Sequence, residues 1–366
     1  MKIYNDPIFN FTEIFNEKNG MLIRTNVLND KGQETNKEPY MRSFPDLIDI
    51  GIMGKCHVNQ LYCKKFGVDC YQSKNNHSDM LLSDYKRIIN QCKGKTFQVA
   101  LGGRGDPNKH KNFKDILKYT LDNGIIPNLT TSGMGMTDNE ITLIQKYCGA
   151  VAVSMYSKVI INEFGIKESN EQTIEIINKL VSKNIITNIH YVISNETLDD
   201  IIFRLENNIF PKGINAIIFL LYKPVGIGLK EKQIIVNDEK FIKFMNIIKN
   251  KKFPFKIGFD TCFSPIIVKY LDNIDSKTID YCEASRFSCY ISPEMIMYPC
   301  SFIQDKKYGI NLKKETILNA WWSSEFRQFK KLNSSKFKGC CPCKLNCLSS
   351  NIKVSVDCSK KITLKW

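Results

Sequence analysis

Residues 46–72 read DLIDIGIMGKCHVNQLYCKKFGVDCYQ, an apolar segment followed at once by three cysteines. The segment Asp46–Ile52 predicts a β-strand of the kind found in parallel sheets that are covered on both faces. The three thiols, Cys56, Cys63 and Cys70, then fall in a loop at the carboxyl end of that strand. Barrel enzymes keep their active sites at this end of their strands. The stretch therefore predicts a functional site of closely spaced thiols.

The middle of the chain continues in the same way, alternating short β-rich runs with amphipathic helical runs. The predicted strands are Asp46–Ile52, Thr96–Leu101, Ile126–Thr131, Ala150–Met155, Ile186–Val192, Ala216–Leu221 and Phe255–Phe259. The predicted helices are Ser83–Cys92, Asn112–Asn123, Thr137–Tyr147, Asn170–Ser182, Thr197–Asn207 and Asp238–Lys249. After the first unit the strands recur about every 25–40 residues, which suits βα units. This order predicts an α/β fold built on a partial (βα)6-type barrel.

The βα rhythm covers only part of the chain, so we expect three parts. Residues 1–43 are polar without a clear period and are interpreted as a cap or a loosely held extension. Residues 44–275 form the predicted barrel, and residues 276–366 form a small cysteine-rich C-terminal domain. Two local signals mark helix ends inside the barrel. Thr137-Asp-Asn-Glu140 fits a capping box, and Gly124 fits the glycine that follows a helix.

Composition excludes several classes of protein. The 366 residues are 43% hydrophobic and 24% charged, enough to build a buried core. No apolar run approaches the roughly 20 residues of a membrane span, and the N-terminus lacks a signal-peptide pattern. We therefore expect a cytoplasmic protein with no membrane partner. The net charge of +15 is interpreted as a lysine-rich solvated surface, because only seven of the 52 cations are arginine. Base recognition in nucleic acids favours arginine, so nucleic acid is not the expected partner.

The 14 cysteines are the abnormal feature of this composition. In a cytosolic chain they indicate metal binding or catalysis rather than disulfides. Three lie within residues 56–70 and eight within residues 282–358. The remaining three, Cys92, Cys148 and Cys262, are isolated along the sequence. Cys92 and Cys148 close helical segments and are expected in the core.

The first cysteine group fits two kinds of metal site. Three thiolates hold three irons of a cubane cluster, and the fourth iron is then open to a further ligand. A structural zinc site would usually need a fourth protein ligand, for which His57 and His77 are the local candidates.

The second cysteine group lies in the C-terminal part. The stretch YISPEMIMYPCSF, residues 290–302, predicts a β-hairpin with its turn at Ser292–Met295 and a Pro-Cys pair at its end. Cys340 and Cys343 form a C-x2-C pair, for which zinc is an alternative. Trp321, Trp322 and Phe326 are expected on a helix that packs into the core.

The strand ends together resemble one enzyme family. Strand Thr96–Leu101 ends in Gly102-Gly103-Arg104-Gly105-Asp106-Pro107, where glycines let a ligand approach the backbone. With the cysteine loop one unit earlier, this order resembles the radical S-adenosylmethionine (SAM) superfamily. The usual family spacing is C-x3-C-x2-C, whereas this chain has C-x6-C-x6-C. The last part of the loop, Cys70-Tyr71, is similar to the family's third cysteine and its following aromatic residue.

This resemblance implies roles for particular residues. Cys56, Cys63 and Cys70 would hold the 4Fe–4S cluster that cleaves SAM. The turn after the second strand would hold the SAM amino group, through Gly102, Gly103, Gly105 and Asp106. Ser132 would lie near the adenosine, and Ser154 near the SAM carboxylate or ribose. His190 on the fifth strand is more often a core histidine.

The C-terminal hairpin closely resembles the SPASM/twitch extension of radical SAM enzymes. The resemblance implies one auxiliary 4Fe–4S cluster, with Cys282, Cys300, Cys340, Cys343 and Cys347 as the candidate ligands. A second auxiliary cluster is the alternative, for which Cys289, Cys341, Cys347 and Cys358 are the candidates.

The implied activity is reductive cleavage of SAM at the barrel cluster, followed by hydrogen abstraction from a substrate. A peptide or protein substrate is preferred, as in a maturase, with flavodoxin or ferredoxin as the expected type of electron donor. A small-molecule radical SAM dehydrogenase is the alternative enzyme. The alternative of another class is a zinc-stabilised nucleic-acid-binding protein.

Overall fold

The computed structural model describes residues 1–56, 76–163, 165–223, 225, 232, 234, 238–271 and 282–331. A ten-stranded sheet forms its centre, in the order β12-β11-β10-β7-β6-β5-β4-β13-β14-β15. Seven parallel neighbours make up the barrel part: β4 (Leu47–Ile50), β5 (Gln98–Leu101), β6 (Ile126–Thr131), β7 (Val151–Ser154), β10 (Thr187–Ile193), β11 (Ala216–Leu221) and β12 (Lys256–Phe259). The predicted α/β fold with a partial barrel is confirmed, and the sheet does not close on itself.

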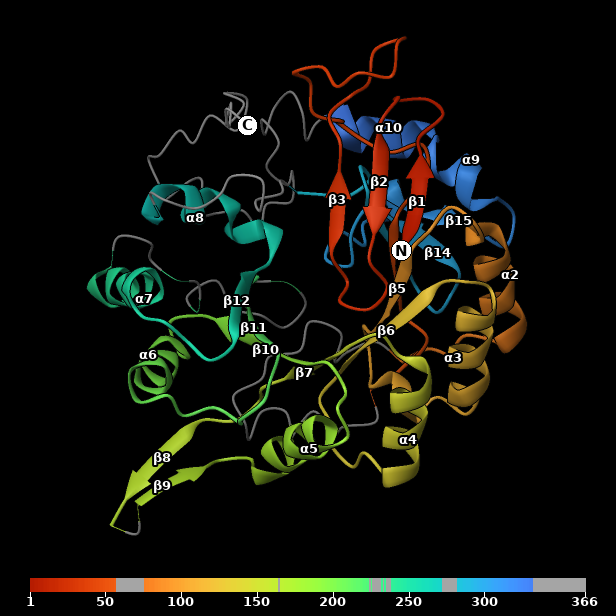
Figure 1. Cartoon of the computed structure of the whole chain (residues 1–366). Coiled ribbons are helices and arrows are strands. Elements are labelled where there is room, and N and C mark those ends of the chain that lie inside the picture. Colours follow the sequence, from red (N-terminus) through yellow and green to blue (C-terminus); the bar gives the residue numbers. More distant parts are fainter. Residues whose placement is uncertain are drawn as a thin grey trace.

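Helices cover the outer face of this sheet. They are α2 (Leu82–Cys92), α3 (Phe113–Asp122), α4 (Asp138–Tyr147), α5 (Glu171–Ser182), α6 (Leu198–Asn207) and α7 (Glu239–Asn250). Figure 1 shows them as an arc around the strands. All six predicted helices are therefore confirmed. The capping box is confirmed too, because the Thr137 hydroxyl accepts from the Glu140 backbone N–H at 3.2 Å and the Glu140 carboxylate accepts from the Thr137 N–H at 2.6 Å. None of the described helices is long and apolar enough to cross a membrane.

The C-terminal part continues the barrel sheet. Strand β13 (Ser288–Ile291) pairs in parallel with β4, and β14 (Ile296–Tyr298) returns antiparallel to β13. The predicted hairpin turn is confirmed, since the Met295 N–H donates to the Ser292 carbonyl at 2.9 Å. Strand β15 (Ile310–Asn311) and helices α9 (Ile317–Trp321) and α10 (Ser324–Lys331) complete this region, while α8 (Ser264–Tyr270) follows β12 in the barrel part. Trp321 and Phe326 are buried as predicted, and Trp322 is half-buried.

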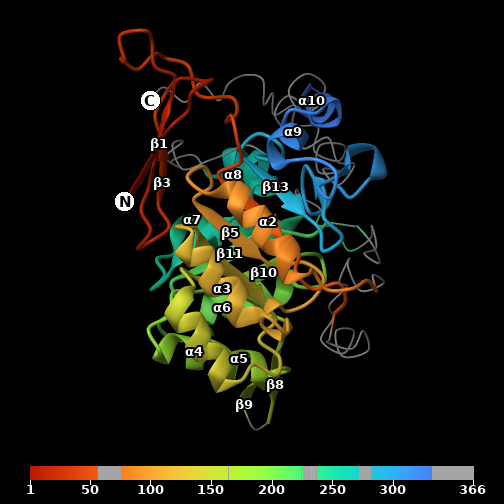
Figure 2. The same ribbon diagram turned by 90° about the vertical axis from the view of Figure 1, so that its right-hand side faces the viewer.

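The N-terminal residues form a small sheet of their own, with strands β1 (Lys2–Asn5), β2 (Thr12–Phe15) and β3 (Leu22–Arg24). Phe15 stacks on Phe97 at a ring distance of 5.2 Å, and both pack against Ile126. Phe97 directly precedes β5 and Ile126 begins β6, so the small sheet covers the amino ends of the barrel strands. Figure 2 shows it standing against one side of the barrel. This packing fits the predicted cap and does not fit a loosely held extension.

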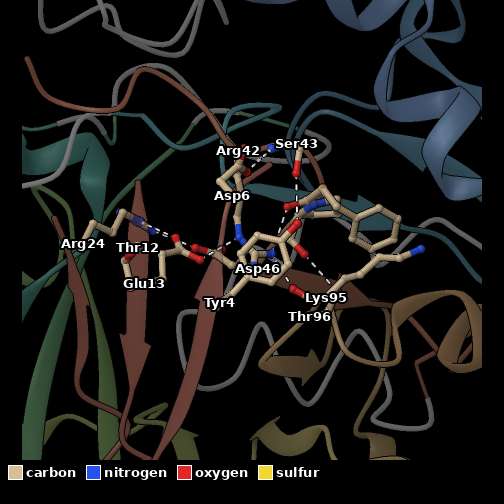
Figure 3. Close-up of polar contacts among 12 residues, drawn as sticks. Tyr4, Asp6, Thr12, Glu13, Arg24, Arg42, Ser43, Asp46, Lys95 and Thr96 are labelled. Carbon is tan, nitrogen blue, oxygen red and sulfur yellow. Dashed lines mark hydrogen bonds and ion pairs between the residues drawn. The ribbon is translucent and has the colours of Figure 1, made fainter. Parts of the chain in front are cut away.

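A buried network of acidic and arginine side chains fixes this cap (Figure 3). Glu13 of β2 lies 2.9 Å from the Arg24 guanidinium and 2.6 Å from that of Arg42, and both Glu13 and Arg42 are fully buried. Arg24 also reaches Asp46, just before β4, at 2.8 Å, and Glu283 of the C-terminal part at 3.1 Å. Burying a guanidinium is costly unless it is paired, and the pairs of Arg24 with Asp46 and Glu283 link the cap, the barrel and the C-terminal part.

A second hairpin was not predicted from the sequence. Strands β8 (Val159–Asn162) and β9 (Gly165–Glu168) pair antiparallel and project away from the barrel in Figure 1. Its base is held by Glu168, which makes two bonds of 2.6 and 2.7 Å to the buried guanidinium of Arg204 on α6. Ile160, Ile161 and Ile166 are exposed although they are apolar. The hairpin therefore lacks the alternation of buried apolar and exposed polar residues that would predict its strands.

Glu13 makes protein stability depend on pH. Burial, reinforced by Asp46, raises the pKa of Glu13 to about 8, against the lowering effect of Arg42 and Arg24. A carboxyl whose folded pKa is raised takes up a proton on folding. Its contribution to stability is therefore complete below about pH 4.5 and is lost as the pH rises through about 8. Urea unfolding at pH 5, 7 and 9 should give a free energy of unfolding that falls as the pH rises. In Glu13→Gln this free energy should depend less on pH. An equal loss in parent and variant would contradict this assignment.

Candidate functional site

The cysteine loop begins at the carboxyl end of β4. Cys56 is a half-buried cysteine six residues beyond Ile50, the last residue of β4. The chain on either side of the loop is held together, because the His77 N–H donates to the Gly54 carbonyl at 3.0 Å and the Gly54 N–H to the Asp79 carboxylate at 2.9 Å. Cys63, Cys70 and the alternative ligand His57 lie outside the described residues. Residues 53–56 and 76–79 thus form a fixed neck for the loop.

The glycine turn after β5 lies against this neck. A Cβ placed on Gly105 would come 2.6 Å from the Lys55 carbonyl oxygen and 3.3 Å from the Cys56 Cα. Only a glycine allows so close an approach without displacing the backbone that carries Cys56. Gly103 has a φ of +107°, a conformation that side chains rarely adopt. The structure therefore brings the predicted SAM turn and the first predicted cluster ligand into contact.

Asp106 and Ser132 are also brought together. Both are buried, and the Asp106 carboxylate accepts from the Ser132 backbone N–H at 2.7 Å and from its hydroxyl at 2.5 Å. The bond joins the turn after β5 to the end of β6. A role of Asp106 toward the SAM ammonium stays a prediction, and its visible role is to hold Ser132 at the mouth of the barrel.

The inner face of the sheet, away from the helices, carries several polar side chains. Ser154 at the end of β7 lies in register with His190 of β10. Burial lowers the pKa of His190 to about 4 and raises that of Asp49, on β4, to about 6. On the same face, the Asn128 amide donates a hydrogen bond of 2.7 Å to Gln98. The Asn188 side chain accepts one of 2.7 Å from Asn215. At neutral pH His190 is therefore uncharged, and a polar substrate group would find hydrogen-bonding partners inside the barrel.

The C-terminal hairpin covers the glycine turn, which the sequence did not indicate. The Tyr290 hydroxyl lies 2.6 Å from where a Cβ on Gly51 would stand and 3.4 Å from where one on Gly103 would stand. Glu294, in the hairpin turn, forms an ion pair with the buried side chain of Arg104. Burial alone would raise the pKa of Glu294, but its bond to Arg104 brings that pKa below the ordinary value. Arg104, which the sequence placed in the turn without a role, thus connects the barrel to the C-terminal part.

The C-terminal thiols divide into two environments. Cys282 and Cys300 are half-buried and pack on the same apolar cluster of Ala284, Tyr308 and Phe329. Cys289, a candidate for a second auxiliary cluster, is instead 2% exposed in the main core. This core position does not favour Cys289 as a ligand. Cys340, Cys341, Cys343, Cys347 and Cys358 lie outside the described residues.

Cys262 and Lys223 also lie near the C-terminal thiols. Cys262 follows β12, and its electrostatic neighbours include Cys282 and Cys300. Lys223, just beyond β11, lies 2.5 Å from the Asp260 carboxylate. Burial opposes a charge on Lys223, but Asp260 and the nearby thiols hold its pKa above the ordinary value. Cys262 is therefore isolated in the sequence but not in space, whereas Cys92 lies in the core and Cys148 packs against it.

The donor chemistry of both thiol groups suits iron–sulfur clusters, which thiolates bind. Across the described ranges, no three histidine, cysteine or acidic side chains are placed to hold a single metal ion. Most of the predicted ligands lie outside those ranges. The fit to a cluster therefore rests on Cys56 at one place and on Cys282 with Cys300 at the other.

Comparison with known proteins gives matches among solved structures. No protein-family model and no curated protein matches the chain. SuiB from Streptococcus suis, bound to S-adenosylmethionine, matches with a TM-score of 0.60 and 16% identity, over 78% of this chain and 67% of that one. The enzyme anSMEcpe with bound AdoMet and Cp18Cys peptide matches with a TM-score of 0.56 and 15% identity, over 87% of this chain and 96% of that one.

Both matching proteins are radical SAM enzymes. At these identities the likeness establishes the fold, so this chain has the radical SAM fold, as its motifs predicted. The fold does not favour the zinc-stabilised nucleic-acid-binding alternative, since the barrel accounts for the glycine turn and for the position of Cys56.

The contact between Gly105 and the cysteine neck gives a test. Gly105→Ala should displace the backbone at Lys55 and Cys56, and so should lower the iron bound at the barrel site after anaerobic reconstitution. Overpacking of this kind typically costs about 1–3 kcal/mol of stability. Gly102→Ala is the matched control, because its Cβ would lie 3.4 Å from the Thr130 Cβ, an ordinary contact. Equal iron content in the two variants would contradict the assigned contact.

Proposed function

We propose that this chain is a radical SAM enzyme that reductively cleaves SAM and abstracts a hydrogen atom from a peptide or protein substrate. The observation that carries the proposal is the close approach of Gly105 to the backbone of Cys56. It brings the predicted SAM turn against the predicted cluster loop at the carboxyl ends of β4 and β5, where barrel enzymes place their chemistry.

The residues at this end of the barrel fit the cofactors. Cys56, with Cys63 and Cys70 from the same loop, would hold a 4Fe–4S cluster. When bound, that cluster would supply the electron that splits SAM into methionine and a 5′-deoxyadenosyl radical. Gly102 and Gly103, which carry no side chain, would let the methionine part of SAM approach the backbone. Ser132, held by Asp106, and Ser154 offer hydroxyl groups at the next two strand ends.

The barrel residues would position the substrate and keep water away from the radical. The inner face offers the uncharged imidazole of His190 and the Asp49 carboxyl, whose raised pKa of about 6 allows it to gain or lose a proton near neutrality. A polar peptide group entering the barrel would therefore find hydrogen-bonding partners among the side chains of this face.

A peptide substrate is supported by the matching structures. SuiB has also been solved bound to the precursor peptide SuiA, and that structure matches this chain with a TM-score of 0.59 and 15% identity. The anSMEcpe structure quoted above holds the Cp18Cys peptide. The described residues offer no observation that favours the small-molecule dehydrogenase over a maturase. A flavodoxin or ferredoxin would supply the electron.

The C-terminal thiols belong to the same proposal. Cys282 and Cys300, which share one apolar cluster, would hold an auxiliary 4Fe–4S cluster together with thiols from Cys340, Cys343 and Cys347. The hairpin that carries Cys300 is bound to the glycine turn through Glu294 and Arg104. The two cluster sites are therefore parts of one folded unit.

The proposal is tested by the formation of 5′-deoxyadenosine from SAM. The anaerobically reconstituted parent, reduced with dithionite, should form it, and Cys56→Ala should reduce it to background because two thiolates cannot assemble the cluster with an open iron. Cys148→Ala, a change at the end of α4, is the matched control and should keep most of the activity. Formation at the parent rate by folded Cys56→Ala would contradict the proposal.

The substrate class needs its own readout. Coexpression with short peptides encoded beside the gene, followed by intact-mass analysis, should show a peptide whose mass changes with the parent and not with Cys56→Ala. If SAM cleavage is coupled only to oxidation of a small molecule, the peptide part of the proposal is wrong.

A further inference from the structure

Lys223 is a buried cation at the mouth of the barrel. Its side chain is 7% exposed, and its ammonium lies 2.5 Å from the Asp260 carboxylate and 3.0 Å from the Leu221 carbonyl oxygen. Strands β11 and β12, which these residues follow, are neighbours in the sheet, so the ion pair spans two adjacent strand ends. Burying an ammonium is costly unless partners compensate for the lost water, and Asp260 provides that compensation.

The same ammonium faces the C-terminal thiols. It lies 4.6 Å from the centre of the Phe302 ring, and the Phe302 backbone N–H donates to the Cys300 sulfur at 3.5 Å. Cys282 packs on the same apolar cluster as Cys300, and Cys262 lies two residues beyond Asp260. A positive charge fixed in the barrel therefore stands near the Cys300 thiol of the C-terminal part.

Charge near an iron–sulfur cluster changes how readily the cluster accepts an electron. Reduction adds negative charge, which a nearby cation stabilises and a nearby anion opposes, and the effect is largest where burial excludes water. Lys223 and Asp260 carry opposite charges, and each can be neutralised separately. The two residues should thus act on the potential in opposite directions.

We propose that Lys223 is a positioning residue that raises the reduction potential of an auxiliary iron–sulfur cluster bound by Cys282 and Cys300, and that Asp260 lowers it. The inference rests on the auxiliary cluster of the proposed function. A lysine that only joined β11 to β12 would stabilise the fold without moving any potential, so the potential separates the two roles.

The test uses the full chain with Cys56, Cys63 and Cys70 changed to Ala, so that the auxiliary cluster gives the whole iron signal. Electron paramagnetic resonance during a redox titration measures its midpoint. Lys223→Met should lower the ratio of reduced to oxidised cluster about tenfold at the parent midpoint, a shift of ~59 mV for one electron. Asp260→Asn should shift the midpoint the opposite way, and Lys223→Arg should stay near the parent value.

Lys256→Met is the matched control for loss of one positive charge. Lys256 is exposed and begins β12, four residues before Asp260, or about 13 Å along the strand. That distance exceeds the screening length of roughly 8–10 Å in ordinary buffers. The midpoint of the auxiliary cluster should therefore not move in Lys256→Met.

Each outcome decides the proposal. An unmoved midpoint in iron-loaded Lys223→Met overturns it, as does an equal shift in Lys256→Met. If Lys223→Met fails to hold iron, Asp260→Asn decides, and an unmoved or lowered midpoint there overturns it. If the triple-cysteine chain folds but binds no iron, the auxiliary cluster is absent and this proposal falls with it. SAM cleavage by the parent chain is measured separately and would stand.

Discussion

The pairing of β4 with two different neighbours is the constraint on which the arrangement depends. On one edge β4 pairs in parallel with β5, and on the other it pairs in parallel with β13, some 240 residues later in the chain. The cysteine loop follows β4, the glycine turn follows β5, and the hairpin turn with Glu294 follows β13. Because carboxyl ends of parallel strands meet at one edge of a sheet, this pairing alone brings all three segments together.

Ionic contacts secure that pairing from both ends. At the amino ends of the strands, Arg24 of the cap binds both Asp46 before β4 and Glu283 before β13. At the carboxyl ends, Arg104 of the glycine turn binds Glu294 of the hairpin. Arg24 and Arg104 are largely buried, and their acidic partners compensate for the water that each guanidinium loses. The barrel and the C-terminal part are therefore joined by ion pairs at both ends of their shared strands.

The sequence predicted what depends on local pattern and missed what depends on distant contacts. The βα units, the capping box at Thr137 and the turn at Met295 follow from periodicity and short motifs, and all were confirmed. The pairing of β13 with β4 joins segments far apart, which no local pattern records. Cys262 looked isolated for the same reason, since it meets the C-terminal thiols only after β12 is placed in the sheet. Lys223 resembled any other lysine in a lysine-rich chain.

The central claim is that Cys56, Cys63 and Cys70 would hold a cluster whose open iron binds SAM. Pulsed electron–nuclear double resonance on the reduced parent chain measures this directly, with SAM that carries heavy nitrogen in its amino group. The account predicts a hyperfine coupling between the cluster spin and the labelled nitrogen, and its disappearance when unlabelled SAM is used. A fully assembled, reduced cluster that shows no coupling to the label in the presence of saturating SAM would contradict the account.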